Sequence, residues 1–117
     1  MRKPLSDKER IGFMLDNIAE LQSSISEISY EEYTHNILLR SGVTKLLQNI
    51  CETSVYITDE TKAKYPDVEW RKMKTMRNIL IHEYFGIDYL VVWDTVINEI
   101  PFLKSMLLKI ATENFGQ

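Results

Sequence analysis

The sequence contains few of the residues that small β-rich or disulfide-linked folds require. Its 117 residues include a single cysteine, Cys51, so no disulfide can form within the chain, which fits a reducing compartment. Four glycines and three prolines leave little material for the many turns of an all-β fold. No apolar run approaches the roughly 20 residues that cross a bilayer. No apolar segment follows the basic residues near Met1, so we expect no signal peptide, no membrane partner and a cytoplasmic location.

The composition is that of one ordinary globular domain, which we expect to span residues 1–117. Hydrophobic residues make up 44% and charged residues 26%, close to average globular usage. A chain of this length can build a core without a metal or a disulfide. The formal net charge of −3 argues against a general nucleic-acid coat protein, which needs many cationic contacts with phosphate.

Positive charge is nevertheless concentrated in one segment. Residues 62–77 contain six cations against two carboxylates: Lys62, Lys64, Arg71, Lys72, Lys74 and Arg77 against Asp67 and Glu69. Such a run is often only a solvated helix face. If the neighbouring residues act on RNA, then Arg71, Lys72 and Lys74 are the candidate RNA contacts.

Apolar residues recur at steps of three and four along most of the chain, which predicts an all-α fold. Ser6 with Glu9, and Ser29 with Glu32, have the spacing of a capping box and predict two helix starts. The expected helices cover about residues 7–28, a short stretch at 30–33, then 36–61, 68–85, 89–98 and 101–110. Asp88 and Pro101 are expected to open the last two. We therefore predict a compact up-and-down bundle of four to five helices.

The segment from Arg77 to Tyr84 reads Arg-Asn-Ile-Leu-Ile-His-Glu-Tyr and contains the residues best suited to chemistry. Arginine is a permanent cation whose planar donors fit phosphate, and histidine can transfer protons near neutral pH. His82 would therefore serve as general acid or base, and Arg77 would stabilise charge on phosphoryl oxygens. Asn78 would orient His82 or bond the phosphate. A ribose 2′-hydroxyl nucleophile needs no metal or cofactor, and the chain has no convincing metal cluster, so the expected substrate is RNA.

The spacing of Arg77 and His82 raises a geometric problem. They are separated by about 140° on one straight helix, because each residue advances by about 100°. Either the helix is distorted near its end, or a second chain completes the site. We favour a two-fold dimer, the commonest oligomer, in which facing copies supply each other's missing group.

These residues also have purely structural interpretations. An arginine and a histidine on one helix are common, and Tyr84 is typical of a core or interface aromatic. Cys51 lies on an apolar stripe and is expected to be buried, whereas His35 is expected to be solvated. Glu52 is a candidate partner for Arg77, although the sequence does not place it. The alternative function is therefore a catalytically silent helical module that binds a nucleotidyltransferase or nucleotides.

The stretch around the motif resembles the HEPN-domain ribonuclease toxins that are paired with minimal nucleotidyltransferase antitoxins. The family's mark is an arginine, four to six residues, a histidine and, in this branch, a tyrosine two residues later, which Arg77, His82 and Tyr84 match. Asn78 matches the polar residue after the arginine, and Glu83 lies in a flank that also agrees, so we take both as supporting residues. The matching flanks are residues 65–71, 83–88 and 92–94.

The resemblance implies the toxin of a type VII toxin–antitoxin module, a helical dimer whose two Arg/His motifs meet in a cleft and cleave RNA without metal. It also implies that the cognate nucleotidyltransferase antitoxin transfers AMP from ATP to Tyr84 and silences the toxin. An anionic group there would compete with RNA for the arginine. The middle helix departs from the family's Arg-Asn-Leu-Glu-Ile-Ile-Gly-Glu-Ala-like run, because Lys45–Thr53 keeps only Leu47, Ile50 and Glu52.

Overall fold

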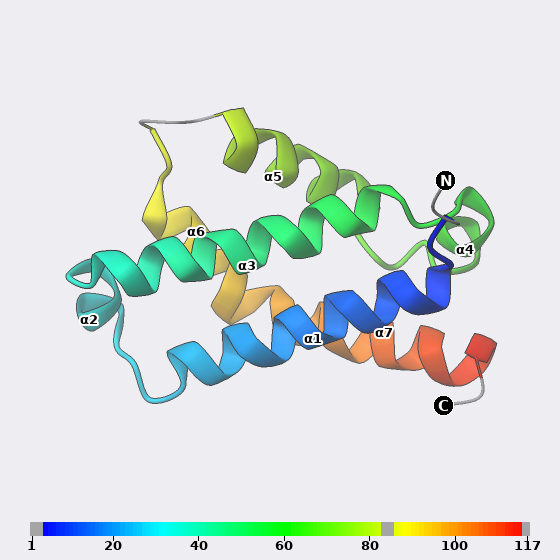
Figure 1. Ribbon diagram of the computed structural model, residues 1–117, viewed down its shortest axis with the longest axis horizontal. Helices are drawn as coiled ribbons and strands as arrows, with labels where there is room; N and C mark the ends of the chain where they lie inside the picture. Colours follow the sequence, from blue (N-terminus) through cyan, green and yellow to red (C-terminus); the bar gives the residue numbers. More distant parts are fainter. Residues whose placement is uncertain (1–3, 83–85, 116–117) are drawn as a thin grey trace.

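The fold consists of helices and the turns that connect them, with no strand, within residues 4–82 and 86–115, the part of the chain that the computed structural model describes. That part contains seven helices (Figure 1): α1 (Asp7–Ile25), α2 (Tyr30–Thr34), α3 (Ile37–Val55), α4 (Asp59–Lys64), α5 (Trp70–His82), α6 (Tyr89–Asn98) and α7 (Ile100–Phe115). The predicted all-α class is therefore confirmed. Five helices have ten residues or more, and α2 and α4 are short segments between them. In these ranges no helix combines the length and the apolar character that crossing a membrane requires.

Side-chain caps begin several helices at residues that the sequence identified. The hydroxyls of Ser6 and Ser29 accept hydrogen bonds from the backbone N–H groups of Glu9 and Glu32, at 3.1 and 3.0 Å. Each glutamate in turn accepts from the N–H of its serine, so both predicted capping boxes are confirmed. Asp88 caps α6 by accepting from two backbone N–H groups of its first turn. Each such cap typically contributes about 1 kcal/mol.

The single helix predicted over residues 36–61 is wrong in its last part. α3 ends at Val55, and Thr58 caps the separate helix α4. Asp7, at the start of α1, stabilises the break, because its carboxylate accepts from the Thr58 N–H at 3.1 Å and from the hydroxyls of Thr58 and Thr61 at 2.6 and 2.7 Å. Partial burial acts to raise the pKa of Asp7, but these hydrogen bonds outweigh it and hold the pKa below its ordinary value.

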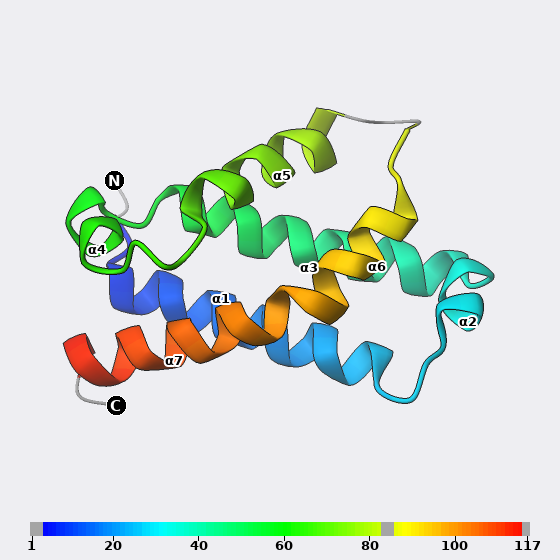
Figure 2. The ribbon, with the colours of Figure 1, turned by 180° about the vertical axis from the view of Figure 1, so that it is seen from behind.

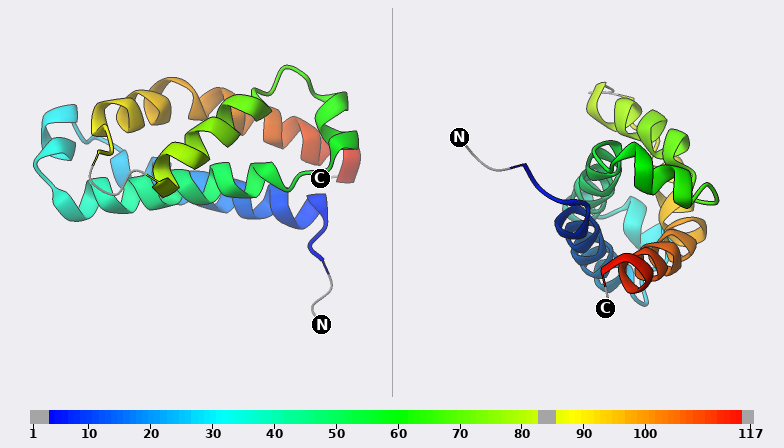
Figure 3. Two further views of the ribbon diagram at one scale, coloured as in Figure 1. Left: turned by 90° about the horizontal axis from the view of Figure 1, so that it is seen from above. Right: turned by 90° about the vertical axis from the view of Figure 1, so that its right-hand side faces the viewer.

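The core lies between α1, α3 and α7. α1 packs against both α3 and α7, and α5 packs against α3 (Figures 2 and 3). Fully buried aliphatic side chains from the three inner helices meet there: Ile18, Leu21, Leu47, Ile50, Leu107 and Ile110. The amide of Asn49 donates to Asn17 Oδ1 at 3.1 Å and links α3 to α1. The inner helices therefore form the scaffold on which α5 is placed.

α6 and α7 are consecutive helices joined at a bend (Figure 2). Pro101 has no N–H to donate to the carbonyl of Ile97, so the helical ladder is broken there. The predicted helix start at Pro101 is thus confirmed to within one residue, since α7 begins at Ile100. The bend leaves Glu99 at the junction, where it meets Lys72 of α5.

Candidate active site

α5 carries the Arg77–His82 segment and lies against α3 as an outer helix (Figure 1). Its beginning is fixed by the residues before it. The indole N–H of Trp70 donates to the carbonyl of Tyr65 at 3.1 Å, and the Tyr65 hydroxyl donates to Glu113 of α7 at 2.7 Å. The start of α5 is therefore tied to the scaffold, while α3 is the principal support along the rest of the helix.

Arg77 is turned toward α3 and is paired with Glu52. Its Nη1 donates to both carboxylate oxygens, at 3.0 Å to Oε2 and 3.3 Å to Oε1. The two side chains are only 20% and 34% exposed, so water screens this ion pair less than a typical surface pair. The candidate pairing of Arg77 with Glu52 is thus confirmed. The Nε of Arg77 is also buried and has no hydrogen-bond partner among the described residues, so this buried donor is unused.

His82 and Asn78 are exposed on another face of α5. Neither side chain makes a hydrogen bond or ion pair within residues 4–82 and 86–115. Since α5 is α-helical through both Arg77 and His82, the rotation of about 140° between them applies. One chain therefore does not aim the arginine and the histidine at the same point. The supporting residue Glu83 and the expected AMP acceptor Tyr84 lie outside the described residues.

The three candidate RNA contacts fall into two groups. The side chain of Lys72 forms ion pairs with Glu99 and, at 3.7 Å, with Glu69. The hydrogen bond to Glu99 is the main reason that the pKa of Lys72 is raised. Arg71 and Lys74 are exposed and have no such carboxylate partner in the described part of the chain. By helical geometry they lie on the side of α5 that carries His82.

An aromatic cluster fixes the segment that follows the motif. The ring of Tyr33 lies 4.8 Å from that of Trp93, and its hydroxyl donates to the carbonyl of Tyr89 at 3.2 Å. Burial raises the pKa of Tyr33, so this hydroxyl stays protonated as a donor. The guanidinium of Arg40 lies 4.9 Å from the centre of the Tyr89 ring. Sequence reasoning missed these supports, for which the only local signal was the three- and four-residue spacing of aromatics in 30–33 and 89–93.

The groups on α5 can perform two elementary tasks. The exposed imidazole of His82 can exchange protons with a bound molecule. The guanidinium of Arg77, held in one orientation by Glu52, can donate hydrogen bonds from its remaining N–H groups to an anionic group that reaches it. Within the described ranges no three histidine, cysteine, aspartate or glutamate side chains are grouped as metal ligands.

The sequence is similar to those of ribonuclease-named proteins over most of its length. A family sequence model described as "Ribonuclease HepT-like" matches residues 14–110. An RNase-named protein of Methanocaldococcus jannaschii is 37% identical over 103 residues, which cover 86% of this chain and 94% of that protein. A protein of Thermococcus cleftensis named "Probable ribonuclease HepT" is 36% identical over 105 residues, covering 90% and 96%. No solved structure matches the chain.

Proposed function

Because the chain belongs to the ribonuclease HepT-like family, we propose that it is a metal-independent endoribonuclease and the toxin of a type VII toxin–antitoxin module. The observation that carries this proposal is the placement of His82. It is exposed, has no partner in the described part of the chain, and shares a helix with an arginine that a carboxylate holds in place. An accessible imidazole of this kind can reach the backbone of a bound RNA.

In the proposed reaction, a ribose 2′-oxygen attacks the adjacent phosphorus. The bond from phosphorus to the 5′-oxygen of the next nucleotide breaks, which leaves a 2′,3′-cyclic phosphate and a 5′-hydroxyl. His82 accepts the proton of the 2′-hydroxyl or donates one to the leaving 5′-oxygen. Arg77 stabilises the negative charge that develops on the non-bridging oxygens, while Asn78 hydrogen-bonds the phosphate or orients His82.

The proposed RNA path follows the exposed face of α5. Arg71, Lys74, Asn78 and His82 are all exposed and lie within roughly 80° of one another around the helix. From Arg71 to His82 the face extends about 16 Å along the helix axis. This path favours Arg71 and Lys74 over Lys72 as phosphate contacts, because Glu99 and Glu69 already neutralise Lys72.

We propose that a two-fold dimer supplies the arginine and the histidine from different chains. The divergence of Arg77 and His82 on α5 supports this arrangement. Exposed aliphatic side chains on the helices that carry and follow the motif also support it: Ile79 on α5, and Leu90 and Val91 on α6. Such side chains are suited to burial against a second copy.

Mixing Arg77→Ala chains with His82→Ala chains tests the two-chain site. If each site takes the arginine from one chain and the histidine from the other, a mixed dimer has one intact site and one doubly altered site. Random pairing makes half of the dimers mixed, so about a quarter of wild-type RNA cleavage should return. Cleavage is measured on co-expressed chains with different tags, and each variant alone provides the inactive baseline. If mixed dimers form but no cleavage returns, the composite site is wrong.

The proposed partner is a minimal nucleotidyltransferase that silences the toxin at Tyr84. The tyrosine oxygen would attack the α-phosphorus of ATP, form a phosphodiester with AMP and release pyrophosphate and a proton. Co-expression should therefore add the mass of at least one AMP group to the chain and restore growth. The Tyr84→Phe chain should gain no such mass, whereas Tyr56→Phe, which alters an exposed tyrosine at the end of α3, should be modified normally. AMP on Tyr84→Phe, or none on the wild type, would contradict this assignment.

A catalytically silent module that binds nucleotides or a nucleotidyltransferase is the second candidate. One observation favours it: Arg77 is engaged by Glu52 and does not face His82 within the chain. A nucleotidyltransferase gene beside this one would fit both functions. Growth arrest with loss of cellular RNA on induction of the wild type fits only the ribonuclease.

A further inference from the structure

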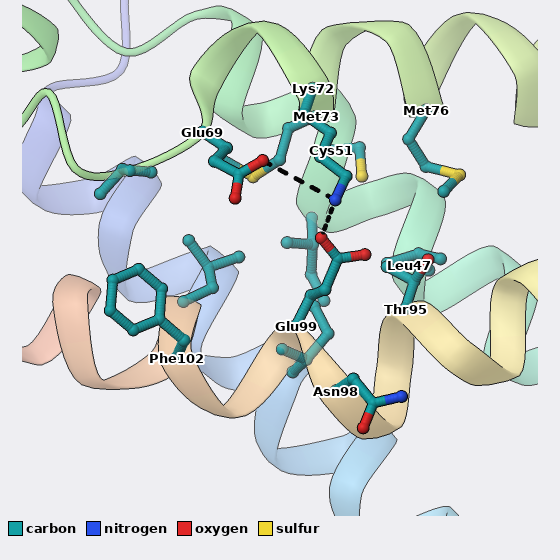
Figure 4. Close-up of a pocket in the computed structure, with 14 residues that line it drawn as sticks. Leu47, Cys51, Glu69, Lys72, Met73, Met76, Thr95, Asn98, Glu99 and Phe102 are labelled. Carbon is teal, nitrogen blue, oxygen red and sulfur yellow. Dashed lines mark hydrogen bonds and ion pairs between the residues drawn. The ribbon is translucent and has the colours of Figure 1, made fainter.

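A cavity of about 270 Å³ lies between α3, α5 and the junction of α6 with α7 (Figure 4). Its inner wall is made of buried side chains: Leu47, Ile50, Cys51, Val68, Ile100 and Leu103. Met73 and Met76 of α5 and Phe102 of α7 complete the apolar lining nearer the surface. Neither Arg77 nor His82 lines this cavity, and by helical geometry the two methionines lie on a different face of α5 from His82, so the cavity is distinct from the proposed ribonuclease site.

The cavity opens to the surface between its exposed rim residues, so a ligand can enter it without the core being disrupted. It arises because α5 packs on α3 without a comparable contact with α6 or α7. Water can enter it, but its mostly apolar lining offers few hydrogen-bond partners. A dry apolar cavity of about 150 Å³ can bind benzene, as the engineered example in another protein shows. The space therefore suits a small apolar molecule.

Charge at the rim narrows the choice of ligand. The Lys72 ammonium lies between Glu99 and Glu69, and these are the charged residues that line the cavity (Figure 4). One cation and two carboxylates give the rim a formal charge of −1. Glu69 lies 3.7 Å from Lys72 and its side chain is 66% exposed, so it has capacity for a second cation. An anionic group at the rim would instead be repelled.

We propose that this cavity binds an apolar cation, a small molecule with an alkyl or aryl body and one ammonium group. The body lies among Met73, Met76 and Leu103, and the ammonium lies at the rim beside Glu69 and Glu99. Methionine suits such a wall, because its unbranched, polarizable side chain adapts to different shapes. Cys51 at the inner wall also behaves as an apolar surface, since burial raises the pKa of its thiol to about 12.

Three probes with the same tail and different heads test the proposal: n-octylammonium, 1-octanol and octanoate. The full chain, labelled at the methionine methyl groups, is titrated with each probe and followed by NMR. Octylammonium should bind saturably and shift the signals of Met73 and Met76, while the signal of Met14, buried in α1, stays in place. Octanol should bind roughly two- to fivefold more weakly, the size of effect that exposed ion pairs produce, and octanoate more weakly still.

Two sets of variants separate the contributions of charge and volume. In Glu69→Gln/Glu99→Gln, octylammonium should lose its advantage over octanol. Cys51→Met fills part of the cavity and should weaken the binding of all three probes. Cys51→Ala leaves the cavity open and should bind them as the wild type does. Thermal melting checks that each variant is folded. If Cys51→Met does not fold, the Glu69→Gln/Glu99→Gln variant still tests the proposal. Equal affinity for all three heads, an unchanged preference in the glutamine variant, or no saturable shift at Met73 and Met76 would overturn the proposal.

Discussion

RNA cleavage by His82→Ala is expected to fall by about 10²–10⁴-fold, the usual contribution of one general acid or base. His82 is exposed and makes no hydrogen bond or ion pair within the described part of the chain, so its removal should leave the fold intact. The fall should therefore appear in the cleavage rate and not in the thermal melting temperature. The measurement is the rate at which an end-labelled RNA gives fragments that end in a 2′,3′-cyclic phosphate.

The matched control is His35→Ala, because His35 is the other histidine of the chain. It is also exposed, follows the end of α2, and its Nδ1 lies 2.8 Å from the carbonyl of Glu31 in the first turn of that helix. Its replacement should change cleavage by less than about twofold, since surface substitutions away from a site have small effects. If both variants lose activity equally, or neither does, His82 is not the general acid or base.

The same assay separates the two candidate functions. A wild-type chain that cleaves no RNA, although it is folded and binds the nucleotidyltransferase, would support the silent module. A wild-type chain that cleaves RNA, with His82→Ala inactive, would exclude it. The result is independent of the cavity between α5 and α7, because that cavity is lined by neither His82 nor Arg77.

The sequence predicted features that depend on neighbouring residues. The capping boxes at Ser6 and Ser29 and the break at Pro101 involve residues no more than a few positions apart. The helical wheel likewise predicted that Arg77 and His82 diverge, because α5 is helical through both. Local patterns are sufficient for such features.

Features that depend on residues distant in the sequence were not predictable in this way. Thr58 caps α4, and Asp7, 51 positions earlier, stabilises the break between α3 and α4 by accepting the hydrogen bonds of Thr58. The ion pair of Lys72 with Glu99 was not predicted, because it forms only where the α6–α7 junction lies beside α5. The Tyr33–Trp93 packing and the cavity similarly arise only when separate helices meet. A contact of this kind has no fixed spacing along the chain, and so periodicity does not reveal it.

Glu52→Gln is expected to lower cleavage about 10–100-fold, because misplacement of a charged group by about 1 Å can cost that much. The carboxylate of Glu52 accepts two hydrogen bonds from Arg77 and holds the guanidinium in one orientation. An arginine that acts mainly on charge in the transition state should affect kcat more than KM. Stability should fall by about 1–2 kcal/mol, between the values for exposed and buried ion pairs.

Glu20→Gln is the matched control, since it makes the same chemical change at an exposed position of α1. It should leave both cleavage and stability within the error of the wild type. A loss of stability in Glu52→Gln without a change in kcat would assign the ion pair to the fold alone.

A double-mutant cycle decides whether Glu52 acts through Arg77. If Glu52 positions the guanidinium, Glu52→Gln should have little further effect on kcat in the Arg77→Ala background, because the group it positions is gone. If Glu52 instead supports the helix or contacts RNA itself, the two losses should add. Arg77→Lys provides a second check, because an ammonium cannot reproduce the planar donor geometry that Glu52 holds. Additive losses would leave Arg77 as a phosphate contact and show that Glu52 does not act by positioning it.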